Sequence, residues 1–361
     1  MHIVKLNLKK RSYNIIIGTK IMPALGRHIS RLNLGNNAYI ITNPFIKSRY
    51  GESLARGLKP YGFNYKFKTV PDSEKSKDIK VAALLIKDLA KFDLKKRTFI
   101  IALGGGVVGD LSGFVASVYK RGIPYIQVPT TLLAQVDSSI GGKTGVDLSE
   151  GKNLVGAFYQ PRMVFSDILL LNTLSKRQLS SGLAEIIKYG MIKDKKLFVY
   201  LEKNYQDILN LKAKPLERIV RACVKIKADV VSQDEREEKG LRTVLNFGHT
   251  IGHAIEAASG FNKYNHGEAI ALGMLVALGM SVKLGLIKED LLKRAELLVK
   301  NVGLPIKISK VSLDKILSRH YHDKKFMGVK NRFVLITGLG KTKIVKDIPL
   351  ALISSAIKER F

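Results

Sequence analysis

The sequence predicts an α/β N-terminal domain with a parallel sheet, followed by a mostly α-helical C-terminal domain. In the first half, short β-branched runs alternate with amphipathic helical runs, a pattern typical of strands that are connected by helices. After about residue 175 long helical runs dominate. The length of 361 residues suits two domains. We therefore expect a boundary near residues 167–175, with domains over 1–175 and 176–361.

The expected elements can be placed in chain order. The N-terminal stretch alternates like a strand, and further strands are expected at 14–18, 37–43, 64–70, 97–106 and 123–131. Apolar residues at helical spacing predict a helix over 79–90. The later helical runs are 176–212, 214–233, 246–260, 266–285 and 288–301, and a hairpin is expected at 332–345.

The bulk composition fits a globular protein without a membrane span. Hydrophobic residues make up 46% of the chain, but no run of 18 apolar residues occurs, so we expect no transmembrane span. The N-terminus lacks the apolar core and cleavage site of a signal peptide. A single cysteine, Cys223, excludes an internal disulfide and fits a cytoplasmic protein.

The net charge of +31, from 61 Lys and Arg against 30 Asp and Glu, allows several interpretations. A polyanion such as nucleic acid is one, but the lysines are scattered, and neither an aromatic-interleaved basic motif nor a zinc-finger spacing is present. We favour a general lysine bias on solvated surfaces and expect no nucleic-acid partner. Some of these cations could still bind an anionic small substrate.

A glycine-rich loop follows the expected strand at 97–106. Gly104, Gly106 and Gly109 stand in the G-x-G-x-x-G register that lets a backbone approach a pyrophosphate at a helix N-terminus. The next strand ends in Thr130 and Thr131 rather than in an acidic residue, so this is not an ordinary dinucleotide fingerprint. It remains compatible with a nucleotide site of another design or with a tight structural turn.

Three of the seven histidines lie in one short window. His249 and His253 are four residues apart on one expected helix face, and His266 precedes another apolar helix. They could be satisfied core residues, a catalytic base with its support, or zinc ligands, since a catalytic zinc takes three protein ligands. Glu185, inside an otherwise apolar helix, could supply a carboxylate ligand or pair with Lys188.

Several segments together resemble one enzyme family. The segments "GGGVVGD", "QVPTTLLAQVDSSIGGKTGV", "GKNLVGAFYQP", "SGLAEIIKYG", "GLRTVLNFGHTIGHAIE" and "HGEA" are similar, in order and spacing, to those of the 3-dehydroquinate synthases over roughly residues 40–330. The resemblance implies a Rossmann-like NAD-binding domain, a helical domain that binds a divalent metal, and a homodimer. It implies a lyase that converts 3-deoxy-D-arabino-heptulosonate 7-phosphate into 3-dehydroquinate and phosphate in the shikimate pathway. The implied steps are transient oxidation by NAD, phosphate elimination, re-reduction, ring opening and aldol closure.

The resemblance also implies site residues, position by position. It implies that Glu185, His249 and His266 bind Zn²⁺ or Co²⁺, and that His253, Lys152, Glu238 and Arg242 are catalytic. The implied NAD contacts are Asn43, Glu74, Lys77, Gly105, Gly106, Asp110, Thr130, Thr131, Asp137, Lys152, Thr173 and Leu174. The implied substrate contacts are Arg121 from the partner subunit, Lys143, Asn153, Lys188, Lys227, Asn246 and Lys324.

Some positions and rival functions stay open. The segment "DEREEKGLR" holds one residue more than the commoner family pattern, so Glu237 could replace Glu238. In the segment "DKK", Lys325 could replace Lys324. A related sugar phosphate cyclase, such as a 2-deoxy-scyllo-inosose synthase, would use the same fold, NAD and metal. A metal-dependent polyol or glycerol-phosphate dehydrogenase would instead release NADH.

Overall fold

The structure is a computed structural model that describes residues 1–94, 97–260, 262–309, 311–325 and 331–361, with the backbone alone at 320–325. The chain divides into two compact units. The first unit contains residues 1–174 and 216–236, and the second contains residues 175–215 and 237–361. Among the described residues, no helix combines the length and the apolarity that crossing a bilayer requires.

The first unit alternates strands and helices. Its elements are β1 (His2–Leu6), β2 (Tyr13–Gly18), α1 (Leu25–Ser30), β3 (Asn37–Thr42), α2 (Pro44–Leu58), β4 (Asn64–Thr69), α3 (Ile79–Phe92), β5 (Thr98–Gly104), α4 (Gly106–Val118), β6 (Tyr125–Pro129), β7 (Lys143–Leu148), β8 (Gly151–Phe158), β9 (Met163–Asp167) and most of α7 (Ala213–Gln233). Short helical turns lie at Glu74–Ser76 (η4), Tyr119–Arg121 (η5), Ala134–Ser138 (η6) and Ile168–Thr173 (η7).

The main sheet of this unit has seven strands among the described residues, in the order β1-β2-β9-β6-β5-β3-β4. All pairs are parallel except β1 with β2. The strand order reverses between β3 and β5, because β4 lies outside β3 while β6 and β9 follow on the other side of β5. In open α/β sheets such a reversal opens a crevice at the carboxyl ends of the strands.

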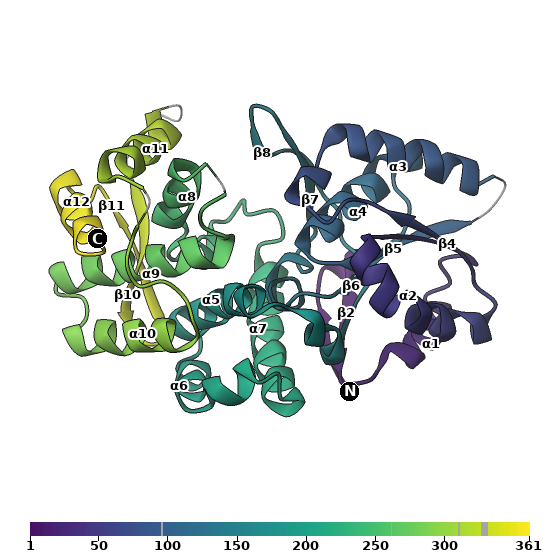
Figure 1. Ribbon diagram of the computed structural model, residues 1–361, viewed down its shortest axis with the longest axis horizontal. Helices are drawn as coiled ribbons and strands as arrows, with labels where there is room; N and C mark the ends of the chain where they lie inside the picture. The colour runs from purple at the N-terminus through teal and green to yellow at the C-terminus, as the bar shows by residue number, and fades with distance from the viewer. Residues whose placement is uncertain (95–96, 261, 310, 326–330) are drawn as a thin grey trace. The chain divides into compact units, whose positions relative to one another are not determined.

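Hydrophobic cores form on both faces of the sheet. Along β3, Ile40 packs with the residues of α1 and α2, whereas Tyr39 and Ile41 pack with α3 and α4 (Figure 1). Side chains alternate between the two faces of a strand, so a strand buried on both faces is apolar throughout, as β5 is. The predicted α/β class with a parallel sheet is confirmed.

Two features of the first unit differ from the sequence expectations. The segment around residues 143–158 forms the hairpin β7–β8, for which no strands were predicted. The predicted division placed 214–233 in the C-terminal domain, but most of α7 belongs to the first compact unit. Two side chains of α7 accept hydrogen bonds from the rest of that unit. Ser232 accepts from the Asn7 N–H, and Glu217 accepts from the Thr19 hydroxyl.

The second unit is predominantly helical, as predicted. Its elements are α5 (Lys176–Ile192), α6 (Lys195–Leu209), η8 (Leu241–Asn246), α8 (His249–Ala258), α9 (His266–Lys283), α10 (Glu289–Asn301), α11 (Leu313–Lys325), β10 (Arg332–Gly338), β11 (Lys341–Lys346) and α12 (Leu350–Lys358). Helix α9 is buried along nearly its whole length and packs against α5, α8, α10, α12 and β10. A helix that is apolar on all sides is expected at such a central position.

The start of α9 is fixed by a capping box. The Asn265 side chain accepts from the Glu268 N–H, and the Glu268 carboxylate accepts from the Asn265 N–H. This box defines His266 as the first residue of the helix. The position of His266 at the first turn of α9 is therefore defined by the local sequence Asn265–Glu268.

Two glycines bring the neighbouring helices close to α9. Gly248, which precedes His249, has a φ of +79°, and a Cβ there would lie 2.5 Å from Met274 Cγ. A Cβ at Gly267, which follows His266, would lie 2.3 Å from the Ser181 carbonyl oxygen on α5. Neither backbone position tolerates a side chain without movement.

We predict that Gly267→Ala destabilises the protein by about 1–3 kcal/mol, because the added methyl group collides with the backbone of α5. Thermal and denaturant unfolding would measure the change. The matched control is Gly279→Ala on the same helix, where the nearest atoms would lie 3.8 Å and 3.9 Å away. The control should leave stability unchanged or raise it by up to about 1 kcal/mol. Equal destabilisation by both variants would contradict this explanation of the packing.

Candidate active site

The predicted cofactor residues of the first unit cluster at one edge of its sheet. Asn43 follows β3, the Gly105–Gly106 pair follows β5, and the Thr130–Thr131 pair follows β6. Glu74 and Lys77 come after β4, and the Thr173–Leu174 pair comes after β9. These strands are parallel, so their carboxyl ends share one edge, where the strand order also reverses. The structure thus groups these predicted residues at the carboxyl edge of the sheet, where open α/β sheets bind nucleotides.

The glycine loop supplies the start of α4. Gly105 caps the helix and Gly106 is its first residue, which leaves backbone N–H groups available at the N-terminus of a helix. A Cβ at Gly105 would lie 2.9 Å from Thr131 Cγ2, so the loop passes directly beside the end of β6. The close approach explains why glycine is needed in this loop.

Ion pairs and hydrogen bonds connect the remaining predicted residues of this unit. Lys77 Nζ lies 2.6 Å from Asp110 Oδ2 and also donates to Asn153 Oδ1. Burial alone would lower the pKa of Lys77, but the Asp110 carboxylate outweighs it and raises that pKa, so the lysine stays charged. Lys152 Nζ lies 3.1 Å from Glu74 Oε1.

Helix α7 contributes a further buried cation. Lys227 Nζ lies 2.7 Å from Asp137 Oδ1 and 2.6 Å from the Asp137 carbonyl oxygen. Asp137 lies in the π-helical turn η6 that follows β6. One predicted substrate residue therefore contacts one predicted cofactor residue within the first unit.

The second unit brings together a carboxylate and two imidazoles from three helices. Glu185 lies on α5, His249 begins α8 and His266 begins α9. Each offers one ligand atom, and the three atoms lie within 4.8 Å of one another. Glu185 Oε1 lies 3.5 Å from His249 Nε2 and 3.3 Å from His266 Nε2. Atoms bound to one tetrahedral Zn²⁺ at 2.0–2.2 Å lie roughly 3.4 Å apart, so these spacings suit a divalent ion.

The orientation of these side chains also suits a metal. Lys188 pairs with Glu185 Oε2, which leaves Oε1 for the two histidines. His249 Nδ1 lies 3.2 Å from the Phe247 carbonyl oxygen, which can only accept. When His249 Nδ1 carries the proton of that bond, Nε2 keeps the lone pair that a metal needs.

Burial and neighbouring charges shift the pKa values of all three groups. Burial lowers the pKa of His249 to about 3, and Lys188 acts in the same direction. Burial would also lower the pKa of His266, but hydrogen bonds to Glu185 and Glu256 outweigh it and raise that pKa to about 10. Burial would raise the pKa of Glu185, yet Lys188, His249 and His266 hold it well below its usual range. The Glu185 carboxylate is therefore charged, as a ligand must be.

Glu256 is a site residue to which the sequence analysis gave no role. It lies on α8 three residues after His253, and its Oε2 lies 2.7 Å from His253 Nδ1. Its Oε1 lies 3.5 Å from His266 Nδ1. The signal in the sequence was the i, i+3 spacing from His253, which places the two side chains on one helix face.

The other predicted residues are distributed over both units. Lys188 is buried beside Glu185, and Asn246 ends η8, shortly before α8. Arg242 Nε pairs with Glu237 Oε1 at 3.2 Å, and both Glu237 and Glu238 are exposed. Arg121 and Lys143, in the first unit, lie in η5 and at the start of β7. The side chain of Lys324 lies outside the described residues, as does that of Lys325.

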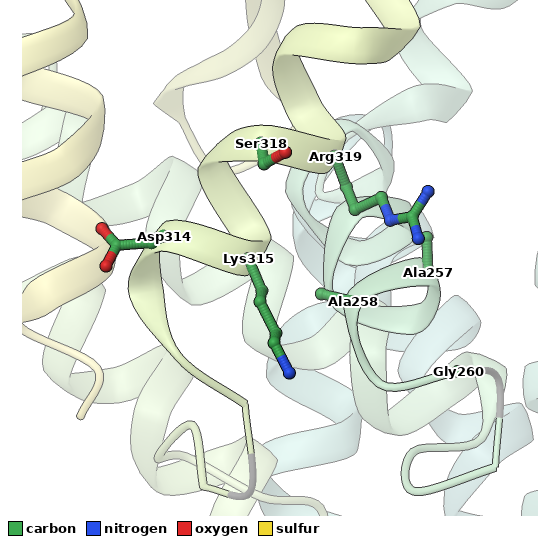
Figure 2. Close-up of a pocket in the computed structure, with 7 residues that line it drawn as sticks. All are labelled: Ala257, Ala258, Gly260, Asp314, Lys315, Ser318 and Arg319. Atoms are coloured by element: carbon green, nitrogen blue, oxygen red, sulfur yellow. The ribbon is translucent and has the colours of Figure 1, made fainter.

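A pocket of about 600 Å³ lies between the end of α8 and α11. Figure 2 shows Lys315 and Arg319 extending from α11 beside Ala258 and Ala257 of α8. Its described lining residues are distinct from the predicted site residues. The Glu185, His249 and His266 group is thus a separate feature of the second unit.

Comparison with known proteins identifies the family. Residues 67–181 match the family profile described as 3-dehydroquinate synthase N-terminal, and residues 182–326 match 3-dehydroquinate synthase C-terminal. The 3-dehydroquinate synthase of Desulforamulus reducens is 46% identical over 362 residues, which cover 99% of this chain and 100% of the relative. The chain belongs to the 3-dehydroquinate synthase family. The resemblance of the sequence motifs to this family is confirmed.

Solved structures of two cyclases are similar to this family member throughout its length. A 2-deoxy-scyllo-inosose synthase, solved with carbaglucose-6-phosphate, NAD⁺ and Co²⁺, has a TM-score of 0.90 at 27% identity and 100% coverage of both chains. The 2-epi-5-epi-valiolone synthase of Streptomyces hygroscopicus, solved with NAD⁺ and Zn²⁺, has a TM-score of 0.89 at 26% identity and 98% coverage of both. The predicted combination of an α/β domain and a helical domain is thus that of known sugar phosphate cyclases.

We predict that His249→Ala lowers the affinity for Zn²⁺ by more than about 100-fold, because even the outer-shell partners of metal ligands contribute 10–100-fold. His253→Ala should retain the metal, since the atoms of Glu185, His249 and His266 remain. Metal content after dialysis, measured by mass spectrometry, would compare the variants with the unchanged protein. Equal loss of metal from both variants would contradict the separate roles of these two histidines.

Proposed function

We propose that this protein is a 3-dehydroquinate synthase, a carbon–oxygen lyase that converts 3-deoxy-D-arabino-heptulosonate 7-phosphate into 3-dehydroquinate and phosphate in the shikimate pathway. The observation that carries the proposal is the 46% identity to a 3-dehydroquinate synthase over the whole of both chains. The Glu185, His249 and His266 group and the nucleotide-type sheet edge give this assignment a chemical basis. The proposed reaction includes an oxidation that needs both a nucleotide cofactor and a metal, and these two features provide a site for each.

The proposed cofactors are NAD and a divalent metal, Zn²⁺ or Co²⁺. Two similar cyclases were solved with NAD⁺ and one of these ions. We propose that Glu185, His249 and His266 are the ligands, since one carboxylate and two imidazoles leave room for substrate oxygens. The proposed NAD contacts are the predicted residues at the carboxyl edge of the sheet. When bound, NAD accepts and returns a hydride, while the metal polarises the hydroxyl and carbonyl oxygens that it holds.

The remaining proposed roles follow from charge and proton chemistry. Arg242 and the lysines Lys143, Lys188 and Lys227 are suited to the carboxylate and phosphate of the substrate. Arg121, Asn153, Asn246 and Lys324 complete the proposed substrate contacts. We propose that His253 and Lys152 move the proton of the hydroxyl that is oxidised. Arg242 pairs with Glu237, so we propose Glu237 as well as Glu238 as the acidic residue of this segment.

Two rival functions have less support. The 2-deoxy-scyllo-inosose synthase shares the fold, but its identity to this chain is 27%, against 46% for the 3-dehydroquinate synthase. A polyol or glycerol-phosphate dehydrogenase would release NADH as a product. The proposed synthase returns its hydride, so it produces no net NADH.

The assembly and location of the protein are part of the proposal. We propose a cytoplasmic homodimer without nucleic-acid or membrane partners, and separate cofactor-binding and metal-binding domains near the predicted division at residue 175. Lys120 and Arg121 both have positive φ angles, of 50° and 60°, and Lys120 Nζ pairs with Asp93 at 2.5 Å. Positive φ values at two successive non-glycine residues store strain, and such strain clusters at functional sites, which supports the proposed role of Arg121.

We predict that the protein, given Zn²⁺, the heptulosonate phosphate and much less NAD than substrate, releases many molecules of phosphate per molecule of NAD. No net NADH should form. Phosphate would be measured by a colorimetric assay and NADH by absorbance. Glucose 6-phosphate, the type of substrate that an inosose synthase uses, should release none. Accumulating NADH would show a dehydrogenase, and phosphate from glucose 6-phosphate alone would show another cyclase.

A further inference from the structure

Glu256 contacts two histidines with its two carboxylate oxygens. Oε2 lies 2.7 Å from His253 Nδ1, and Oε1 lies 3.5 Å from His266 Nδ1. His253 is on the same helix, three residues earlier, whereas His266 begins α9. The Glu256 side chain is only 12% exposed, so little water competes for its oxygens. One side chain therefore connects the proposed proton-handling histidine with one of the proposed metal ligands.

The chemistry of a carboxylate decides which nitrogens carry protons. A charged carboxylate has no hydrogen to donate, so each imidazole nitrogen that bonds to it must carry a proton. Glu256 consequently selects the Nδ1–H form of both His253 and His266. His253 in that form has a lone pair on Nε2, and His266 Nε2 gains one when a metal ion displaces the proton that this nitrogen shares with Glu185 Oε1.

The two lone pairs have different surroundings. His266 Nε2 faces Glu185 Oε1 at 3.3 Å, within the group that suits a divalent ion. His253 is 56% exposed in its side chain, and its ring lies 5.3 Å from that of His249. One lone pair can therefore bind a metal, while the other can take a proton beside it.

We propose that Glu256 is a positioning residue that orients His266 toward the metal and His253 toward the substrate at the same time. The inference rests on the proposed function, because it assigns Glu256 to the same site. It predicts that Glu256 affects both the affinity for the metal and the turnover of the metal-loaded enzyme. A carboxylate that only stabilised the end of α8 would affect neither.

Glu256→Gln tests this proposal with little change in shape. An amide has one acceptor oxygen and one donor nitrogen, so it cannot accept from both histidines. At least one imidazole must then turn or change its tautomer. The matched control is Glu202→Gln on α6, which removes a carboxylate that holds Arg294 through two hydrogen bonds at 2.9 Å and 2.8 Å. Glu256→Asp keeps the carboxylate but shortens its reach.

The measurements separate metal affinity from turnover. Affinity for Co²⁺ would be measured by competition with a chelator, and kcat and KM would be measured at saturating Co²⁺. We expect Glu256→Gln to lower the affinity and kcat by about 10–100-fold each, with little change in KM. Glu256→Asp should lie between Glu256→Gln and the unchanged protein, and Glu202→Gln should match the latter. Thermal unfolding of the metal-free proteins would show that each variant is folded.

Several outcomes would overturn the proposal. Unchanged Co²⁺ affinity in Glu256→Gln would show that Glu256 does not orient His266, and unchanged kcat would show that it does not orient His253. If His253→Ala abolishes the binding of Co²⁺ that the unchanged protein retains against the chelator, the ion lies between His253, Glu256 and His266 instead. If the unchanged protein releases no phosphate, the proposed function fails, but the Co²⁺ competition still decides the role of Glu256 in metal binding.

Discussion

The buried carboxylate of Glu185 is the constraint on which the second unit depends. It is fully buried, and an ion removed from water costs several kcal/mol unless partners compensate it. Lys188 supplies one partner from the same helix, whereas His249 and His266 begin two other helices. The close approaches at Gly248 and Gly267 and the capping box at Asn265 keep these helix starts in place. Apolar packing alone would not require a charged group at this position. Its presence is explained if the helices are assembled to hold an ion.

The first unit is built around a parallel sheet rather than around a buried carboxylate. Its parallel strands end at one edge, where the glycine loop and the start of α4 present backbone N–H groups suited to an anion. Lys77, Asp110, Lys152 and Glu74 pair with one another around this edge, so their charges are already balanced. Lys227 joins them from α7, a helix that comes later in the chain. A few of the many lysines therefore have defined carboxylate partners, and Lys77 and Lys227 among them are buried.

Much of this organisation could be predicted from the sequence. The strands at 14–18, 37–43 and 97–106 are runs of β-branched residues, and the metal-type histidines stand out because they share one window. The hairpin β7–β8 was not predicted, because glycines interrupt both strands and the residues of β8 are exposed or only half-buried. The amphipathic pattern of α7 shows that it buries one face, but not which unit covers it. Glu256 resembled an ordinary polar helix residue, since its partner His266 is distant in sequence. Pairings such as Glu256 with His266 on the next helix, or Arg242 with Glu237 in the preceding turn, require the three-dimensional structure.

The central claim is that Glu185, His249 and His266 hold the catalytic metal. The most direct test is a crystal structure of the Zn²⁺-loaded protein with anomalous differences recorded on both sides of the zinc absorption edge. We expect one strong peak about 2.0–2.2 Å from a Glu185 carboxylate oxygen and from Nε2 of both histidines. A peak between His253, Glu256 and His266, or no peak near Glu185, would contradict the account.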